Sequence, residues 1–270
     1  MAIRIGAVNY LNTKPLIYDL ERLAPEAQLS LEVPSRLADD LAAARLDVGL
    51  IPVIEHFRAG CYTVVPGIAI ASRGPVLSVT LFSKAPWPDI RRIALDAGSR
   101  TSAALVQILL RKRYGVTPEI LSLPLDQRAE DTDTDAVLLI GDRAMRACLA
   151  GFAHAYDLGR EWHEWTGLPF VYAFWSVRRG VDLGPVFDAL QESKRLGLLR
   201  CGEIAEREAP LLGLDAGFCR RYLQNIIDFE LGKDELAGLR RFYQLATELN
   251  LAPDGVELEF YRPRRLAPVR

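Results

Sequence analysis

The sequence predicts an α/β fold made of two lobes, with one lobe inserted into the other. Apolar segments of strand length alternate with helix-like segments through residue 60, which is typical of a parallel sheet with right-handed crossovers. The same alternation restarts at residue 92 and continues to residue 150. Two β-prone segments, residues 76–83 and 168–177, bracket this second run, and we expect them to join the lobes. The expected lobes are residues 1–82 plus 177–270 (lobe I) and residues 83–176 (lobe II).

The first strand, residues 3–8, ends in a polar elbow before the next apolar residues. Pro15 stands where the first turn of a helix accepts proline, and Asn12 or Thr13 can cap that turn. In a parallel α/β sheet such elbows open at the carboxyl edge, where ligands bind. Asn12 is therefore either a turn and cap residue or part of a binding site.

The remaining elements follow from apolar period and from turn residues. After the first strand we expect strands at residues 28–33, 46–52, 64–70, 92–95, 120–123 and 136–140. Helices are expected at residues 36–45, capped by Ser35, at 103–113, and from the elbow Gly141-Asp142 through Ala150. Residues 156–167 are expected to be irregular, and the C-terminal third to contain helices at roughly 185–196, 202–211, 215–227 and 233–249. This helical third either covers the first lobe or carries a homodimer interface.

Composition excludes several classes of function. Half of the 270 residues are hydrophobic and a quarter are charged, which is ordinary for a globular protein. The net charge of −2 gives no reason to expect nucleic acid or an anionic membrane as a partner. The N-terminus enters a strand without the basic and apolar regions of a signal peptide, and no apolar run is long enough to span a membrane. We expect a cytoplasmic protein that acts on a small molecule.

Metal and nucleotide motifs are missing from the sequence. The four cysteines form no CxxC pair and the three histidines show no HxxxH or HExxH spacing, so neither a disulfide framework nor a zinc site is indicated. No GxSxG, GxGxxG or GxxxxGK[ST] pattern occurs either.

The clearest candidate site is the elbow from Gly98 to Ser102 at the start of an expected helix. Ser99, Thr101 and Ser102 supply hydroxyls, Arg100 supplies a positive charge, and the helix start supplies free N–H groups. Together these groups make a receptor for a carboxylate or a phosphate. The alternative is an ordinary helix cap beside a surface arginine.

Two further polar residues lie where a cleft between lobes would be lined. Ser78 stands on the first connecting segment, and Asp142 follows a buried strand. Asp142 is either a base or a helix cap, with the cap favoured. The residues by themselves predict a two-lobe binder of a small anion.

The elbows together resemble one family, the chorismate dehydratases of the futalosine route to menaquinone. The resemblance covers most of the chain, in order. It rests on Val8-Asn9-Tyr10-Leu11-Asn12-x-x-Pro15-Leu16, Pro34-Ser35-x-Leu37-Ala38, Leu46-Asp47-Val48-Gly49-Leu50-Ile51-Pro52, Ser72-x-Gly74-Pro75-Val76-x-Ser78, Leu95-Asp96-x-x-Ser99-Arg100-Thr101-Ser102 and Leu139-Ile140-Gly141-Asp142-x-Ala144. The helical C-terminal third matches only in character.

The resemblance implies a type-2 periplasmic-binding-protein fold, with two α/β lobes joined by two crossover strands and the substrate in the cleft between them. It implies a cytoplasmic hydro-lyase, without metal or organic cofactor, that converts chorismate into 3-[(1-carboxyvinyl)oxy]benzoate by loss of water. Asn12 and Ser78 are the expected catalytic residues. The expected substrate-binding residues are Tyr10, Leu11, Ser35, Ser99, Arg100, Thr101, Ser102, Gly141 and Asp142.

Two alternatives remain besides the chorismate dehydratase interpretation. One is the sister enzyme that makes 1,4-dihydroxy-6-naphthoate later in the same route, against which Tyr10-Leu11-Asn12 and the Ser99–Ser102 elbow argue. The other is a solute-binding protein without catalysis, for which a signal peptide and a lipid-attachment cysteine would be expected. For the dehydratase, the base is either the substrate's own enolpyruvyl carboxylate or Asp142.

Overall fold

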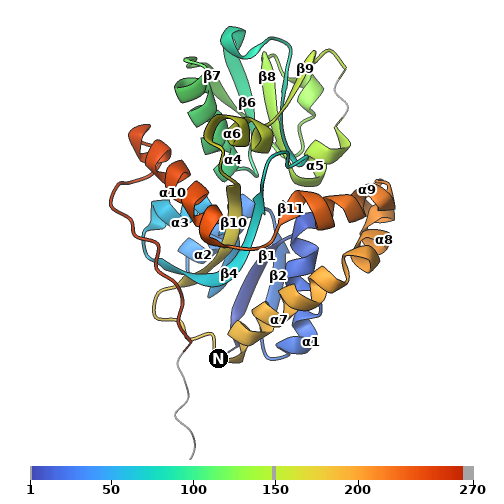
Figure 1. The fold of residues 1–270 in the computed structure, drawn as a ribbon, viewed down its shortest axis with the longest axis vertical. Helices are drawn as coiled ribbons and strands as arrows, with labels where there is room; N and C mark the ends of the chain where they lie inside the picture. The colour runs from blue at the N-terminus through green and yellow to red at the C-terminus, as the bar shows by residue number, and fades with distance from the viewer. Residues whose placement is uncertain (1, 148–149, 264–270) are drawn as a thin grey trace, which may run out of the picture.

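The structure is a computed structural model that describes residues 2–147 and 150–263, and it consists of two α/β lobes (Figure 1). The sheet of lobe I has the strand order β11-β4-β10-β3-β1-β2. Its strands are β1 (Arg4–Val8), β2 (Gln28–Glu32), β3 (Val48–Pro52), β4 (Tyr62–Ser72), β10 (Phe170–Arg178) and β11 (Ile227–Asp228). Strand β1 runs parallel to β2 and β3, as predicted, whereas β10 runs antiparallel to β3 and β4.

The sheet of lobe II has the order β7-β6-β8-β5-β9 and lies at the top of Figure 1. Its strands are β5 (Val79–Ser83), β6 (Arg92–Asp96), β7 (Glu119–Leu123), β8 (Ala136–Ile140) and β9 (His154–Asp157). The predicted two-lobe α/β class is thus confirmed. The chain passes between the sheets twice, once between Ser72 and Val79 and once between Asp157 and Phe170. The expected limits at residues 82 and 177 fall within β5 and β10, whereas the strand pairing puts the whole of β5 in the sheet of lobe II and the whole of β10 in that of lobe I.

The segment after β1 differs from the expected α-helix. Residues Leu11–Ile17 form a 3₁₀ helix, η1, with Pro15 inside it, and the α-helix α1 covers only Leu20–Leu23. Proline lacks the N–H that an α-helical turn needs and its ring crowds the preceding turn, which favours the tighter conformation here. Tyr10 occupies the position before η1, so neither Asn12 nor Thr13 is its cap.

Lobe I also contains α2 (Pro34–Ala42) and α3 (Val53–Ala59). Pro34 starts α2 and Val33 is its N-cap, so the predicted cap role of Ser35 is wrong. Proline is favoured at a first helical position because its missing N–H would have no partner there. Ser35 therefore lies in the first turn, where it is buried.

Lobe II contains α4 (Thr101–Ile108), which continues as the π-helical turn η3 (Leu109–Arg113), and α5 (Gly141–Arg146). The helix expected through Ala150 ends at Arg146; Cys148 and Leu149 lie outside the described residues. Short 3₁₀ turns, η2 and η4, cover Trp87–Asp89 and Ala129–Asp131.

The stretch expected to be irregular forms the end of β9 and the helix α6 (Leu158–Thr166). The carboxylate of Asp157 caps α6 by accepting a hydrogen bond from the N–H of Arg160, and Gly167 ends it with φ at +71°. Trp162 is fully buried on its inner face. This helix contradicts the expected irregular structure, because its aromatic residues lie at helical spacing and pack inward.

The C-terminal third forms α7 (Pro185–Leu199), α8 (Cys201–Leu212), α9 (Ala216–Arg221) and α10 (Lys233–Glu248), close to the expected helices. Helix α9 continues as a π-helical turn, η5 (Tyr222–Ile226), that leads into β11. Helix α7 packs on η1 so closely that a Cβ atom at Gly197 would lie 2.0 Å from the carbonyl oxygen of Pro15. The helical third thus covers lobe I and braces the segment that carries Asn12.

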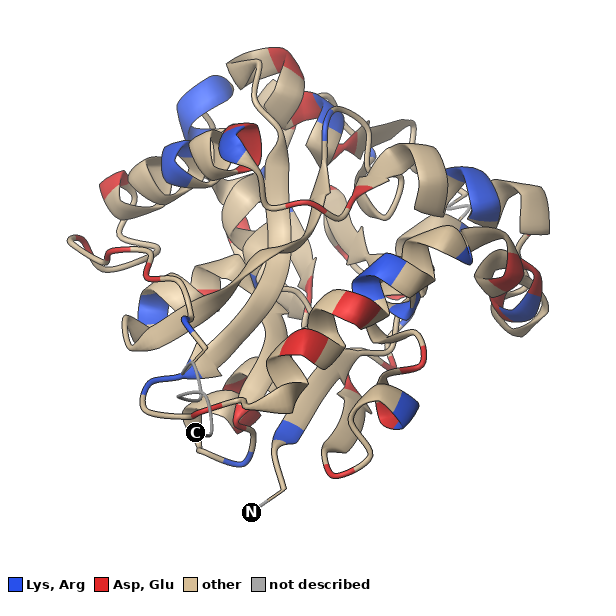
Figure 2. Ribbon diagram, turned by 60° about the horizontal axis from the view of Figure 1, so that its bottom comes forward, with Lys and Arg blue, Asp and Glu red and all other residues tan. Residues whose placement is uncertain are grey.

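Charge pairs fasten the edge of lobe I away from the second lobe. The carboxylate of Asp47 accepts hydrogen bonds from Arg4 Nη2 and from Arg178 Nη2, both over 2.8 Å, and so joins β1, β3 and β10. The bond from Arg4 holds the pKa of Asp47 well below its usual range. Elsewhere basic and acidic positions are mixed along the ribbon (Figure 2). No helix in the described parts of the chain is long and apolar enough to cross a membrane.

Candidate active site

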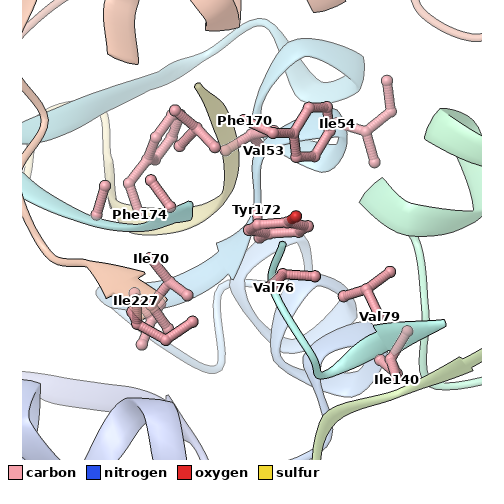
Figure 3. Close-up of a cluster of buried hydrophobic side chains, with 14 of the residues drawn as sticks. Val53, Ile54, Ile70, Val76, Val79, Ile140, Phe170, Tyr172, Phe174 and Ile227 are labelled. Atoms are coloured by element: carbon pink, nitrogen blue, oxygen red, sulfur yellow. The ribbon is translucent and has the colours of Figure 1, made fainter. Parts of the chain in front are cut away.

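A cavity lies between the lobes and is lined by residues from both of them. It opens at the carboxyl ends of β1, β3, β6 and β8 and beside the first crossover. Apolar and aromatic side chains make most of its wall. Figure 3 shows the Tyr172 ring among side chains from both sheets, including Ile70, Val79 and Ile140. The lining residues are Val8, Tyr10, Asn12, Pro34, Pro52, Ile70, Val76, Ser78, Val79, Ser99, Arg100, Thr101, Ser102, Ile140, Gly141, Tyr172 and Ala173.

The elbow between β6 and α4 supplies the anion-receptive wall of the cavity. Asp96 shapes this elbow, because its carboxylate accepts a hydrogen bond from the N–H of Gly98 over 2.9 Å and one from Arg143 Nη1 over 3.0 Å. Ser99 Oγ accepts a bond from the N–H of Ala103. The N–H groups of Thr101 and Ser102 precede the first internal bonds of the helix, so they can hold an anion.

Arg100 and Thr101 also connect this elbow to lobe I. The hydroxyl of Thr101 accepts a hydrogen bond from the N–H of Ile54 over 3.4 Å. The guanidinium of Arg100 lies 3.6 Å from the carboxylate of Asp39 on α2, and its Nε atom is buried without a hydrogen-bond partner among the described residues. Arg100 thus bridges the two lobes at the cavity.

Asn12 and Ser78 meet through a residue from the C-terminal third. Asn12 Nδ2 donates a hydrogen bond to Tyr222 Oη over 3.1 Å, and Tyr222 Oη donates to Ser78 Oγ over 2.8 Å. Asn12 and Ser78 line the cavity, whereas Tyr222 lies behind them, 1% exposed. Burial raises the pKa of the Tyr222 phenol far above its ordinary value, so it stays protonated.

Gly141 and Tyr10 close the cavity on the side of β8. The ring of Tyr10 packs so tightly on Gly141 that a Cβ atom there would lie 2.7 Å from Tyr10 Cε2, and the φ of +58° at Gly141 also favours glycine. The N–H of Gly141 donates to the carbonyl oxygen of Ser78 over 2.8 Å. Gly141 therefore helps to fix the backbone that carries Ser78.

Asp142 makes a contact between the lobes outside the cavity lining. Its Oδ1 atom accepts a hydrogen bond from the N–H of Leu11 over 3.2 Å. Burial raises the pKa of its carboxyl, against the opposing effect of that bond. Asp142 thus fastens lobe II to the start of η1 and is not among the residues that line the cavity.

The structure gathers most of the predicted site residues around this one cavity. Tyr10, Asn12, Ser78, Gly141 and the four residues Ser99–Ser102 all line it. Three others lie next to it without lining it: the core residue Leu11, the buried Ser35 on α2 and Asp142. Their roles in binding and catalysis stay predictions.

Sequence reasoning missed two buried tyrosines at the site. Tyr172 lines the cavity, and its hydroxyl lies 3.2 Å from Ser72 Oγ. Tyr222 links Asn12 to Ser78. Tyr172 stands within an aromatic strand and Tyr222 within a helical stretch without a motif, so no local signal could have selected them. In the described residues no cluster of three His, Cys, Asp or Glu side chains could hold a metal ion.

Comparison with known proteins identifies the family. A family model described as menaquinone biosynthesis matches residues 3–248. The chorismate dehydratase of Thermus thermophilus is 34% identical, over 92% of this chain and 96% of that protein. The chain belongs to the chorismate dehydratase family. The chorismate dehydratase of Campylobacter jejuni is 28% identical, over 92% of this chain and 99% of that protein. The resemblance seen in the elbow motifs is thereby confirmed.

Solved structures of other proteins share the fold of this chain at low sequence identity. A protein from Archaeoglobus fulgidus superposes with a TM-score of 0.71 at 19% identity, over 93% of this chain and 98% of that one. The periplasmic aliphatic sulphonate binding protein of Escherichia coli gives a TM-score of 0.67 at 20% identity, over 100% of this chain and 94% of that one. At such identities the likeness shows the fold alone, and it confirms the periplasmic-binding-protein-like fold.

Proposed function

We propose that this chain is a hydro-lyase that dehydrates chorismate to 3-[(1-carboxyvinyl)oxy]benzoate, the first step of the futalosine route to menaquinone. Besides family membership, one observation carries the proposal. The cavity between the lobes joins an anion-receptive helix start, at Ser99–Ser102, to a pair of oriented polar groups, Asn12 and Ser78. Chorismate has two carboxylates and a ring hydroxyl, which this combination fits.

The reaction removes the elements of water from the ring. The C–H bond on the carbon that carries the enolpyruvyl ether breaks and leaves its electron pair to the ring. The neighbouring C–O bond breaks as the hydroxyl departs, and the removed proton and the departing hydroxide together balance as one water. The product ring is aromatic, so the driving force is large. The protein has to supply a fixed geometry, a base in reach, and help for the leaving group.

One carboxylate of chorismate binds at the start of α4. Moving a carboxylate out of water requires several hydrogen bonds or a charge partner. The N–H groups of Thr101 and Ser102 supply the hydrogen bonds, and the positive charge of Arg100 supplies the charge partner. The apolar wall around Tyr172 and Ile140 then holds the ring and excludes water from it.

The substrate's own enolpyruvyl carboxylate takes the ring proton. Among the described residues, those that line the cavity include no Asp, Glu or His. The rival base, Asp142, lies outside the lining and already accepts the N–H of Leu11. Asn12 holds the enolpyruvyl carboxylate or the departing hydroxyl, and Ser78 donates a hydrogen bond to the charge that develops on the substrate.

Incubation of the purified protein with chorismate tests the proposal. The expected product is lighter than chorismate by one water and shows the ultraviolet absorbance of a benzoate. Chorismate recovered unchanged, with the protein folded, would contradict the proposal; a rise in melting temperature with chorismate but no product would indicate a binding protein.

Localisation and assembly are further parts of this proposal. We place the enzyme in the cytoplasm, where a biosynthetic enzyme of this family would meet chorismate. A homodimer is a separate prediction, which light scattering of the purified protein tests directly: a molar mass twice that of the chain supports it, and the mass of one chain contradicts it.

A further inference from the structure

Tyr222 is the least expected residue at the site, since the C-terminal third carries no motif of the family resemblance. It begins the π-helical turn η5 and lies against Phe218, with the two rings nearly parallel and their centroids 6.4 Å apart. Its hydroxyl reaches η1 on one side and the first crossover on the other. π-Helical turns are uncommon and often occur at functional sites.

The hydrogen bonds of Tyr222 have a fixed direction. The Nδ2 atom of Asn12 can only donate, so Tyr222 Oη accepts from it. The single phenolic proton then goes to Ser78 Oγ. Ser78 therefore receives a bond from behind, and its own proton remains for a partner in the cavity.

This arrangement makes a chain of donors that ends at the substrate. Each bond in such a chain polarises the next, and the effect is larger where water is excluded. Tyr222 and Ser78 are each 1% exposed. Carboxylates of Asp142 and Asp157 nearby add to burial in keeping the phenol protonated, since both raise its pKa.

We propose that Tyr222 is a positioning residue that acts through Ser78: it accepts from Asn12, donates to Ser78, and so directs the Ser78 hydroxyl proton at the reacting substrate. This inference rests on the proposed dehydratase function. Tyr222 itself touches no substrate, because Ser78 and Asn12 separate it from the cavity. Its loss should reduce the rate of elimination without weakening the binding of chorismate at the start of α4.

The variant Tyr222→Phe removes one oxygen atom and keeps the ring on Phe218. We expect kcat to fall by about tenfold or more, as loss of an oriented donor does, with KM changed by less than about threefold. The matched control is Tyr243→Phe on α10, a tyrosine that also stacks on a phenylalanine, Phe57, and whose hydroxyl donates to Pro253 O far from the cavity. The control should keep the wild-type kcat.

A double-mutant cycle separates action through Ser78 from general loosening. On a Ser78→Ala background, Tyr222→Phe should lower kcat by less than about twofold, because the hydroxyl it directs is already gone. A loss as large as in the wild-type background would overturn the proposal, and so would wild-type kcat in the single variant.

A second variant keeps the test decisive if Tyr222→Phe does not fold. Asn12→Asp preserves shape but replaces the donor with an acceptor, so the phenolic proton turns toward the new carboxylate and Ser78 must donate to Tyr222. We expect its kcat to be as low as that of Asn12→Ala or lower. A kcat above that of Asn12→Ala would overturn the proposed role of Tyr222. If the wild-type protein leaves chorismate unchanged, the proposed function is wrong. If the wild-type protein dehydrates chorismate normally and the variants contradict the expectations above, only the proposed role of Tyr222 is wrong.

Discussion

The carboxylate of Asp157 accepts a hydrogen bond from the N–H of Leu77 over 2.7 Å and joins the two crossovers at the residue before Ser78. The same carboxylate accepts from the N–H of Val76 over 2.9 Å. Leu77 has φ at +63°, a left-handed conformation that costs energy for a side chain of this size. Strain of this kind persists only where the surroundings hold it. Asp157 thus fixes the backbone that aims Ser78 into the cavity.

We predict that Asp157→Asn lowers kcat by about tenfold and also lowers the melting temperature. One of the two side-chain oxygens becomes an amide nitrogen that cannot accept, so either the crossover N–H groups or the N–H of Arg160 lose their acceptor. The matched control is Asp135→Asn in lobe II. Its carboxylate accepts from two consecutive N–H groups, those of Arg91 and Arg92, both over 2.8 Å and away from the cavity. Steady-state kinetics and thermal melting measure both variants. An equal loss of kcat in the control, or none in Asp157→Asn, contradicts this role.

We predict that Thr101→Val weakens chorismate binding by roughly 1–3 kcal/mol, the effect of removing a hydroxyl that bonds a buried charged group. The Thr101 hydroxyl accepts from the N–H of Ile54, so its proton is available to a carboxylate at the helix start. Thr247→Val on the exposed face of α10 is the control. KM from initial rates, or Kd from calorimetry, reports the change; an unchanged KM and kcat would remove Thr101 from the site.

We predict that acid destabilises the fold partly through His56. Its ring is buried, its Nδ1 lies 2.9 Å from Ser176 Oγ, and burial lowers its pKa to about 4. The unfolded chain binds the imidazole proton below its ordinary pKa near 6.5, and the folded protein only near 4. Stability from this group is therefore complete above about pH 6.5 and declines as the pH falls toward 4, by up to about 3 kcal/mol.

Urea unfolding between pH 7 and pH 4 tests this effect. In His56→Gln the free energy of unfolding should depend less on pH than in wild type, by that amount over the window. His154→Gln, at a partly exposed position on β9, should follow the wild-type slope. Identical slopes in His56→Gln and wild type would show that His56 does not set the acid sensitivity.

The parts of the site that lie in short elbows could be predicted from the sequence, because the polar groups of each elbow are close together in the chain. Ser99–Ser102 and Gly141 carry their hydroxyls, N–H groups and backbone freedom within a few residues, and the structure brings them to one cavity. Tyr222 could not be found in this way. Its function depends on a contact 144 positions from Ser78, which only the packing of the C-terminal helices creates.

Other differences have equally specific causes. The helix expected after β1 became a 3₁₀ helix because Pro15 falls inside it, not at its first position. Val33, and not Ser35, is the N-cap of α2, because Pro34 occupies the first helical position. The strain at Leu77 has no sequence signature, since a leucine gives no sign of a left-handed backbone; only its contact with Asp157 explains it.

The central claim is that the substrate, and not a protein carboxylate, takes the ring proton while Asn12 and Ser78 orient and stabilise the reacting groups. The most direct measurement compares kcat for chorismate dehydration in Asn12→Ala and in Asp142→Asn, with both variants shown to be folded. Asn12→Ala should lose about a hundredfold or more, as removal of an oriented donor does. Asp142→Asn keeps an acceptor for the N–H of Leu11 and should retain most of its turnover. An inactive Asp142→Asn beside a normally active Asn12→Ala would contradict substrate-assisted elimination.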